Sequence, residues 1–416
     1  MQQFHQATDI TLKNSFEQTQ FIDWRTQPRS FKHYPKFFRR FNINEYKELD
    51  FIKNFGKITT TKKYGKDEID LRANPSAGGL YPCEIYIQIR GIKGILSGIF
   101  HYEPLNDMIT LIHELSNDGV EYYLNTNSKK FIFLISNVYF RSSWKYDNRA
   151  IRYLLLDTGH QLGAIYTALK NQNIKFDIKF DFDKKSLNKE FGLNSQEFFQ
   201  CAILVENEKE TKPKKLRENL VSVAPTDYFI KNRFIEEFIK KLEDTNIKKY
   251  FDIKILENIE IKNIQNSIDK RRSIRGFKKE SITKNEFNEI VKDIFTIAQK
   301  LHIDIFFINN NVENMKLGIY KNVTLLKEGE FKALATKLAF NQKLGGDSCF
   351  TLIYTSKDIK NYILCYVFSA FLAHIISLRA TNLNIESSGI GAYFDDQSQK
   401  ILDTTNNILY LQAIGR

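Results

Sequence analysis

Lys145 and Tyr146 stand next to each other in the sequence, and both side chains can exchange a proton. Removing a proton from carbon requires a positioned base. Free lysine and tyrosine have pKa values of about 10, so burial or a charged neighbour must perturb either side chain before it can act near neutrality. Asp147 follows directly and could hold the lysine in its charged form or simply face solvent. We interpret the pair as a candidate acid–base group, with an exposed loop pair as the alternative.

A group of basic residues in the second half of the chain could bind a phosphate. Forked guanidinium donors match the acceptor oxygens of a dianionic phosphate, and a serine hydroxyl among them adds a further donor. The C-terminal arginine, at the end of an extended segment, could reach the same anion. The alternative is a solvated helix end. The candidate phosphate ligands are Arg271, Arg272, Ser273, Arg275 and Arg416.

Two glycine-containing segments could let the backbone approach a flat ligand closely. Residues 75–82 precede a strand-like segment and place a serine and a tight glycine turn at its start. Residues 388–393 follow a long apolar run. Neither segment matches the G-x-G-x-x-G fingerprint or a P-loop, and each could be only a structural turn. The candidate cofactor contacts are Pro75, Ser76, Ala77, Gly78, Gly389, Ile390, Gly391 and Ala392.

These candidates are distributed over two halves that resemble each other. Segments of similar sequence recur about 210 residues apart and in the same order. Strand-like residues 131–135 are echoed by residues 350–354, and helix-like residues 153–169 by residues 362–378. Each half then closes on another strand-like segment. An ordered repeat of this kind predicts two copies of one α+β unit.

A charge-dense stretch containing Pro213 separates the two copies and is typical of an exposed linker. The amphipathic residues 234–242 follow it and predict a connecting helix. A chain of 416 residues is long enough for two hydrophobic cores. We therefore expect one domain over residues 1–206, a linker and helix over residues 207–262, and a second domain over residues 263–416.

The amino-acid composition indicates which kinds of binding partner the protein is expected to have. The net charge of +12 arises from lysines and arginines interleaved with acids, which predicts a solvated basic surface rather than a nucleic-acid partner. The four cysteines form no C-x-x-C pair, and no metal-ligand set can be assembled, so we expect a reduced cytoplasmic setting and no metal site. Residues 362–378 are apolar but shorter than the ~20 residues of a membrane span, which predicts a buried core helix and no membrane partner.

At these motifs the chain resembles the nitroreductase superfamily. Within it, the chain resembles tandem members of the SagB/ThcOx or McbC-like group, the dehydrogenases that oxidise azolines in peptide natural products. The resemblance extends over both halves. Besides residues 75–82 and 271–275, it rests on shorter segments in the order of the family, at residues 4–8, 23–24, 27–32, 101–104, 145–146 and 157–160.

The resemblance implies an α+β fold in which two nitroreductase-like domains are fused as an intramolecular pseudo-dimer. Each domain would have a mixed antiparallel sheet flanked by helices around a central buried helix. The resemblance also implies flavin mononucleotide (FMN) as cofactor, with the arginine–serine segment of one copy and the proline–serine loop of the other binding it. The counterpart segments, residues 37–40 and 301–312, lack these patterns, so we expect one flavin per chain.

The activity implied by the resemblance is an FMN-dependent dehydrogenase or oxidase. It would pass a hydride from an azoline, or from another peptide- or amino-acid-derived substrate, to flavin N5, and oxygen would reoxidise the flavin. Lys145 or Tyr146 would handle the proton. Such an enzyme serves the maturation of peptide natural products beside a biosynthetic partner enzyme. The alternatives are an NAD(P)H-dependent reductase of the nitroreductase type and a noncatalytic scaffold that binds a peptide or partner.

Overall fold

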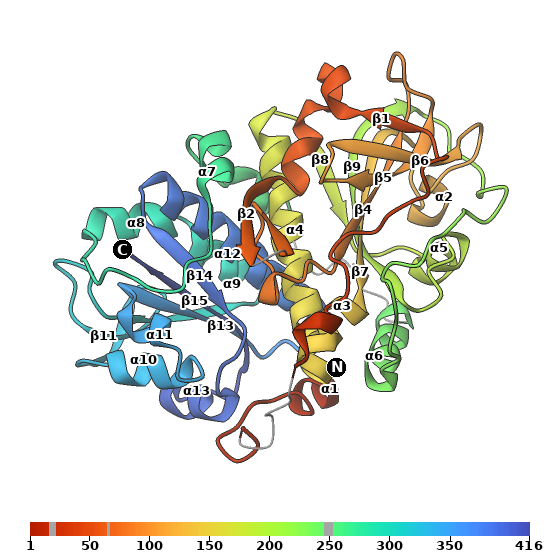
Figure 1. Cartoon of the computed structure of the whole chain (residues 1–416). Coiled ribbons are helices and arrows are strands. Elements are labelled where there is room, and N and C mark those ends of the chain that lie inside the picture. Colours follow the sequence, from red (N-terminus) through yellow and green to blue (C-terminus); the bar gives the residue numbers. More distant parts are fainter. Residues whose placement is uncertain (16–21, 65–66, 245–252) are drawn as a thin grey trace. The chain divides into compact units, whose positions relative to one another are not determined.

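The computed structural model describes residues 1–15, 22–64, 67–244 and 253–416, and the chain divides into two compact units (Figure 1). The N-terminal unit comprises Asp23–Arg72 and Ser76–Lys249. The C-terminal unit comprises Tyr250–Arg416 together with two earlier segments, Met1–Ile22 and Ala73–Pro75.

The core of the N-terminal unit is a seven-stranded sheet whose neighbouring strands pair antiparallel. Its central strands β4 and β7 are buried over most of their length, so polar residues such as Glu84 and Gln88 of β4 are buried together with the apolar ones. A separate hairpin pairs β2 (Ile58–Tyr64) with β3 (Asp67–Arg72). In spatial order the sheet consists of β1 (Arg40–Asn42), β6 (Met108–Glu114), β5 (Gly98–Glu103), β4 (Cys83–Ile89), β7 (Ser128–Val138), β9 (Glu197–Lys209) and β8 (Phe176–Lys179).

A long helix, α4 (Ala150–Asn171), packs against β4 and β7 and is buried over all but its last residues. It is the central buried helix that the sequence predicts for this half. The remaining described helices of the unit are shorter. They are α2 (Glu121–Leu124), α3 (Tyr139–Tyr146), α5 (Lys184–Glu190), α6 (Arg233–Asp244) and the 3-10 helices η1 (Trp24–Thr26), η2 (Ile43–Glu45), η3 (Lys47–Phe55), η4 (Ala77–Gly79) and η5 (Asp147–Arg149).

The C-terminal unit contains a six-stranded antiparallel sheet and its own long buried helix, α12 (Tyr362–Asn382). In spatial order the strands are β12 (Thr324–Glu328), β11 (Gly318–Lys321), β10 (Asp304–Asn309), β13 (Phe350–Ser356), β15 (Asn407–Gly415) and β14 (Glu386–Ile390). The other described helices are α1 (Gln2–Gln6), η6 (Ile253–Asn258), α7 (Ile264–Lys270), α8 (Lys284–Val291), α9 (Ile294–Lys300), α10 (Lys332–Leu338), α11 (Lys343–Asp347) and α13 (Asp395–Leu402).

The two sheets have the same topology. The order β6-β5-β4-β7-β9-β8 in one unit corresponds strand by strand to β12-β11-β10-β13-β15-β14 in the other, and β1 is an additional edge strand. In each unit the long buried helix follows the fourth of these strands along the chain, α4 after β7 and α12 after β13. The repeat and the α+β fold class predicted from the sequence are therefore confirmed.

The unit boundaries differ from the expected domain boundaries. Residues 1–22, expected in the first domain, belong to the C-terminal unit because the backbone of Ile10 pairs with that of Asp395 and His5 contacts Tyr362. The predicted connecting helix is α6, which belongs to the N-terminal unit and buries Ile235, Phe238, Ile239 and Leu242. Residues 245–252 of the predicted linker lie outside the described residues.

The helix α12 is long and apolar enough to cross a membrane by length and composition, and it is the one described helix that passes this test. Its most apolar 18-residue window is completely buried inside the fold. The helix is therefore part of the hydrophobic core, as the sequence predicts.

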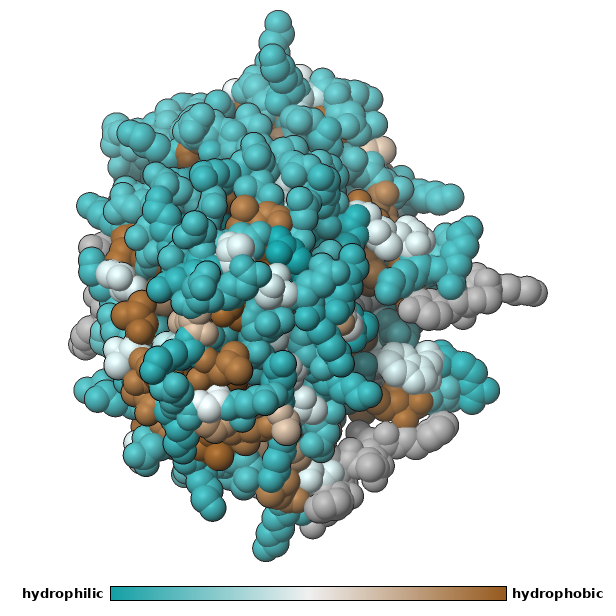
Figure 2. All heavy atoms as spheres, turned by 90° about the vertical axis from the view of Figure 1, so that its left-hand side faces the viewer, coloured by the Kyte–Doolittle hydropathy of each residue, from teal (hydrophilic) through white to brown (hydrophobic). Residues whose placement is uncertain are grey.

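Hydrophilic side chains cover most of the face drawn in Figure 2, with apolar patches among them. Among the exposed apolar residues are Leu326 of the edge strand β12, at 51%, and Val323 directly before that strand, at 78%.

Candidate active site

The glycine turn at residues 76–82 is built from two consecutive residues in the left-handed region. Gly78 and Gly79, within η4, have φ values of 66° and 69°. Only glycine adopts this conformation without a steric cost from its side chain. Their position explains the Gly-Gly pair in the motif: the chain reverses here and enters β4.

A buried carboxylate from α4 holds the start of this turn. Asp157 accepts hydrogen bonds from the Ser76 hydroxyl at 2.9 Å and from the Ala77 backbone N–H at 3.1 Å. Burial raises the pKa of Asp157 to about 7, although these two hydrogen bonds oppose the shift. The Ser76 oxygen also accepts from the backbone N–H of Tyr81 at 2.9 Å. The serine that we expected at the cofactor thus shapes the turn as well.

The end of the turn is anchored at Tyr81, a buried residue with a φ of 44°. Its hydroxyl accepts from the backbone N–H of Arg72 at 2.8 Å, and its carbonyl accepts from Arg141 at 3.0 Å. Arg141 in turn forms a buried ion pair with Glu84 at 2.6 Å. A left-handed tyrosine persists only where surrounding contacts hold it, and these contacts make the turn a fixed element.

The turn brings the glycine pair to the candidate acid–base group. A Cβ placed on Gly78 would lie 2.7 Å from the hydroxyl of Tyr146 and 3.3 Å from the ammonium of Lys145. Both side chains come from the C-terminal end of α3 and are partly exposed. The structure therefore places two features predicted separately from the sequence next to each other in one unit.

Lys145 is held by an aromatic partner. Its ammonium lies 4.6 Å from the centre of the Trp24 ring and 5.4 Å from that of Tyr146, and such cation–π contacts help to position it. Asp147 is exposed and accepts a hydrogen bond from Asn232 at 2.9 Å. Of the two roles considered for Asp147, this partner favours the solvent-facing one.

In the C-terminal unit, the predicted phosphate ligands follow α7. Arg271 is buried; its Nε donates to the carbonyl of Ala73, and its Nη1 donates to the Ser273 hydroxyl at 3.3 Å. Ser273 itself is exposed and forms a backbone bridge with Ser387 of β14. The hydrogen bond from Arg271 to Ser273 makes these two residues one donor group.

Burial and the charge of Arg271 lower the pKa of His374, on α12, to about 3, so this histidine is neutral.

The other predicted phosphate ligands have different surroundings. Arg275 is exposed, and Arg272 donates through Nη1 to the carbonyls of Asp269 and Arg271 at 2.9 and 2.8 Å. Arg416 pairs with Glu286 at 2.5 Å and donates to the carbonyl of Ser281 at 3.1 Å. Because a carboxylate already neutralises Arg416, we expect it to contribute less to anion binding than Arg271 or Arg275.

The glycine at position 389 has a packing reason. It lies in β14, and a Cβ there would collide with the hydroxyl of Tyr410 on the adjacent β15. Ile390 is buried, whereas Gly391 and Ala392 are partly exposed in the segment that leads to α13. Packing alone therefore explains Gly389 and Ile390, and no ligand needs to approach them. Gly391 and Ala392 stay the better candidates for cofactor contacts.

Sequence reasoning gave no role to Asp157 or Trp24, although both lie in segments that carry the family resemblance. The available signal for Asp157 was a carboxylate within the apolar residues of a buried helix, since charged residues are almost never buried without a partner. Trp24 carried no such signal, because its partner Lys145 is more than one hundred residues away in the chain.

No family model matches the chain. Its whole length superposes on the crystal structure of a predicted nitroreductase from Anabaena variabilis with a TM-score of 0.83 and 21% identity, covering 100% of this chain and 99% of the other. This chain has a nitroreductase-like fold. At this level of identity the likeness establishes the fold alone.

Two further similar proteins, one curated sequence and one solved structure, match a smaller part of this chain. A predicted nitroreductase of Methanocaldococcus jannaschii is 29% identical over 106 residues, which are 24% of this chain. The match spans 53% of that curated relative. A chain of the Escherichia coli microcin synthetase McbBCD complex, with truncated pro-MccB17 bound, has a TM-score of 0.32 and 13% identity and covers 50% of this chain and 86% of its own. A score this low gives no support for a shared substrate.

Proposed function

We propose that this chain is an FMN-dependent oxidoreductase that dehydrogenates an azoline or a related peptide- or amino-acid-derived substrate. The observation that carries the proposal is the proximity of Tyr146 and Lys145 to the glycine turn at Gly78. The nitroreductase-like fold supports the flavin, and the resemblance of the motifs to azoline dehydrogenases supports the substrate class.

The donor group of the C-terminal unit fits the phosphate of FMN. Arg271 is fixed by the Ala73 carbonyl and reaches Ser273, and both Ser273 and Arg275 are exposed. Guanidinium and hydroxyl donors of this kind bind phosphate oxygens through charge-assisted hydrogen bonds. We assign the phosphate to these three residues, with Gly391 of the same unit as a further cofactor contact. FMN, when bound, supplies the hydride acceptor of the reaction.

The proton is assigned to Tyr146. The ammonium of Lys145 lies 4.6 Å from the centre of the Trp24 ring, so we assign this lysine the role of electrostatic partner rather than that of base. The ammonium lies 5.4 Å from the centre of the Tyr146 ring, near enough to stabilise negative charge on this residue during the reaction. In this assignment the phenolate of Tyr146 takes the proton from the substrate carbon, and Lys145 stabilises the charge before transfer. The buried Asp157 keeps the adjacent turn in place.

Anaerobic single-turnover kinetics test this function. The protein reconstituted with FMN and mixed with an azoline-containing peptide should lose its oxidised-flavin absorbance. Tyr146→Phe should slow this loss by about 10²–10⁴-fold, the usual contribution of a general base, with FMN affinity unchanged. Tyr153→Phe is the matched control, because its ring lies 4.3 Å from that of Tyr146 and it also loses a hydroxyl.

Two results would contradict the proposal. Equal rates for Tyr146→Phe and the wild type would remove the tyrosine from the reaction. Rapid bleaching by NADPH, with none by azoline peptides, would instead identify a nicotinamide-dependent reductase.

A further inference from the structure

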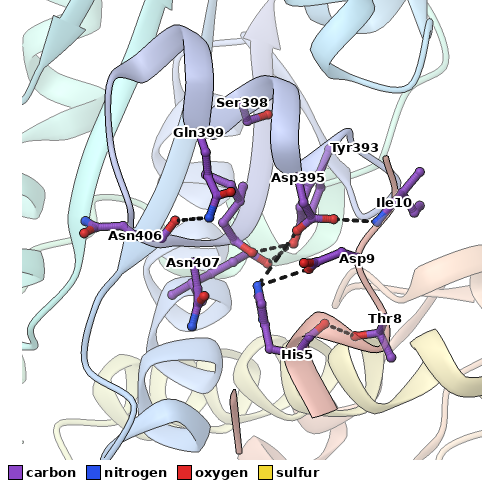
Figure 3. Close-up of polar contacts among 12 residues, drawn as sticks. His5, Thr8, Asp9, Ile10, Tyr393, Asp395, Ser398, Gln399, Asn406 and Asn407 are labelled. Atoms are coloured by element: carbon purple, nitrogen blue, oxygen red, sulfur yellow. Dashed lines mark hydrogen bonds and ion pairs between the residues drawn. The ribbon is translucent and has the colours of Figure 1, made fainter. Parts of the chain in front are cut away.

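A cluster of one imidazole and two carboxylates lies in the C-terminal unit, apart from the residues assigned to the flavin. His5 belongs to α1, Asp9 follows that helix, and Asp395 is the first residue of α13. One ligand atom from each lies within 4.8 Å of the other two. Figure 3 shows the imidazole and both carboxylates pointing toward a common centre.

The separations in this cluster suit ligands of one ion. His5 Nε2 lies 3.5 Å from Asp9 Oδ1 and 3.9 Å from Asp395 Oδ1, whereas N–H···O hydrogen bonds measure about 2.7–3.2 Å. Two atoms that each lie about 2.0–2.2 Å from a tetrahedral zinc ion are roughly 3.3–3.6 Å apart. The 3.5 Å separation from Asp9 falls in this range, the 3.9 Å separation from Asp395 is about 0.3 Å longer, and neither is that of a hydrogen bond.

The opposite edge of the imidazole is oriented from α12. His5 Nδ1 lies 3.2 Å from the Tyr362 hydroxyl and 3.3 Å from the Tyr366 hydroxyl. Tyr366 donates its own proton to the carbonyl of Ile408 at 3.4 Å, so its oxygen can accept the Nδ1 proton. This tautomer directs the Nε2 lone pair at the two carboxylates, and metal-ligating histidines are oriented by a hydrogen bond at their other nitrogen in this way.

The two carboxylates differ in a way that fits an accessible ion. Asp395 is 2% exposed, and its Oδ2 accepts from the Ile10 backbone N–H at 2.9 Å, which leaves Oδ1 toward His5. The Asp9 side chain is 28% exposed and gives an ion a path from solvent.

We propose that His5, Asp9 and Asp395 bind a divalent cation of the zinc class. Imidazole and carboxylate ligands suit such ions, and three protein ligands leave a fourth position for water. The ion joins α1 to α13 and so fixes the first residues of the chain on the C-terminal unit. The sequence did not predict the site, because Asp395 is 386 residues from Asp9 and no local ligand spacing results.

Calorimetric titration with zinc chloride tests the proposal on the full chain after treatment with EDTA and dialysis. We expect one zinc ion per chain and an increase in Tm on its addition. Asp9→Asn and Asp395→Asn should each weaken zinc binding by at least 10–100-fold, the effect of losing even an outer partner of a metal ligand. Asp9→Asn changes the most exposed ligand and is the variant best able to fold.

His302→Gln is the matched control. This histidine also pairs with a carboxylate of the C-terminal unit, Asp358, at 2.7 Å, and its loss should leave zinc affinity unchanged. The proposal is overturned if the wild type binds no zinc, or if both Asn variants bind it as the wild type does. A wild-type Tm that does not respond to zinc would also overturn it. None of these measurements depends on flavin, so their outcome is independent of the proposed oxidoreductase function.

Discussion

At the scale of single residues, the glycine turn is supported by one carboxylate whose titration falls near neutrality. Asp157 lies on α4 and binds the hydroxyl of Ser76 and the N–H of Ala77. Its pKa is raised to about 7 by burial, from 3.8 in the unfolded chain. Between these two values the folded state binds more protons than the unfolded state, so this residue makes the free energy of unfolding fall as pH rises.

Asp157→Asn should remove this dependence. The wild type should lose stability relative to the variant by up to roughly 1.4 kcal/mol per pH unit between pH 4 and 7, and the difference should be constant above pH 7. Urea unfolding at several pH values measures it. The exposed Asp177, changed to Asn, is the control and should run parallel to the wild type. Parallel curves for Asp157→Asn as well would show that the carboxylate is ionised throughout.

At the scale of elements, the turn after Pro75 and the end of α3 form one functional arrangement. Gly78 and Gly79 have nearly the same positive φ but different neighbours. A Cβ on Gly78 would lie 2.7 Å from the Tyr146 hydroxyl, whereas a Cβ on Gly79 would meet only Leu71, at 3.8 Å. An alanine at either position has the same cost in backbone strain, but only an alanine at Gly78 would also contact the acid–base pair. Comparing the two substitutions therefore separates these effects.

Gly78→Ala should slow flavin reduction much more than Gly79→Ala. Both variants bear a backbone cost of about 1–2 kcal/mol in stability, but only Gly78→Ala displaces Tyr146 and Lys145. Single-turnover rates, measured on samples shown to be folded by circular dichroism, give the comparison. Equal rates for the two variants would separate the turn from the chemistry.

The sequence predicted the turn but not what holds it. Gly-Gly before an alternating strand is a local signal, and so is the apolar run of α4. The contact between Ser76 and Asp157 joins residues 81 positions apart. Local propensity contains no information about such a pairing. The same reason applies to Trp24, which lies over the ammonium of Lys145.

At the scale of the whole molecule, the repeat was the strongest prediction. The order of apolar segments is retained in both halves, and each half forms the same strand order around a long buried helix. Residues 1–22 belong to the C-terminal unit, and the sequence could not predict this. The assignment depends on contacts of α1 with α12 and of Ile10 with Asp395. Chain order alone assigns the N-terminus to the nearest domain, and side-chain contacts decide otherwise.

We propose that the chain binds FMN through its phosphate, at Arg271, Ser273 and Arg275. Titration of the flavin-free protein with FMN and with riboflavin, followed by quenching of flavin fluorescence, tests it most directly. We predict one FMN per chain and riboflavin binding weaker by about 10–100-fold, as expected for the loss of one charge-assisted hydrogen bond or more. A Ser273→Ala, Arg275→Ala double variant should show a smaller difference between the two flavins, because only Arg271 of the three phosphate ligands remains. Equal affinity of the wild type for FMN and riboflavin, or no binding of either, would contradict the account.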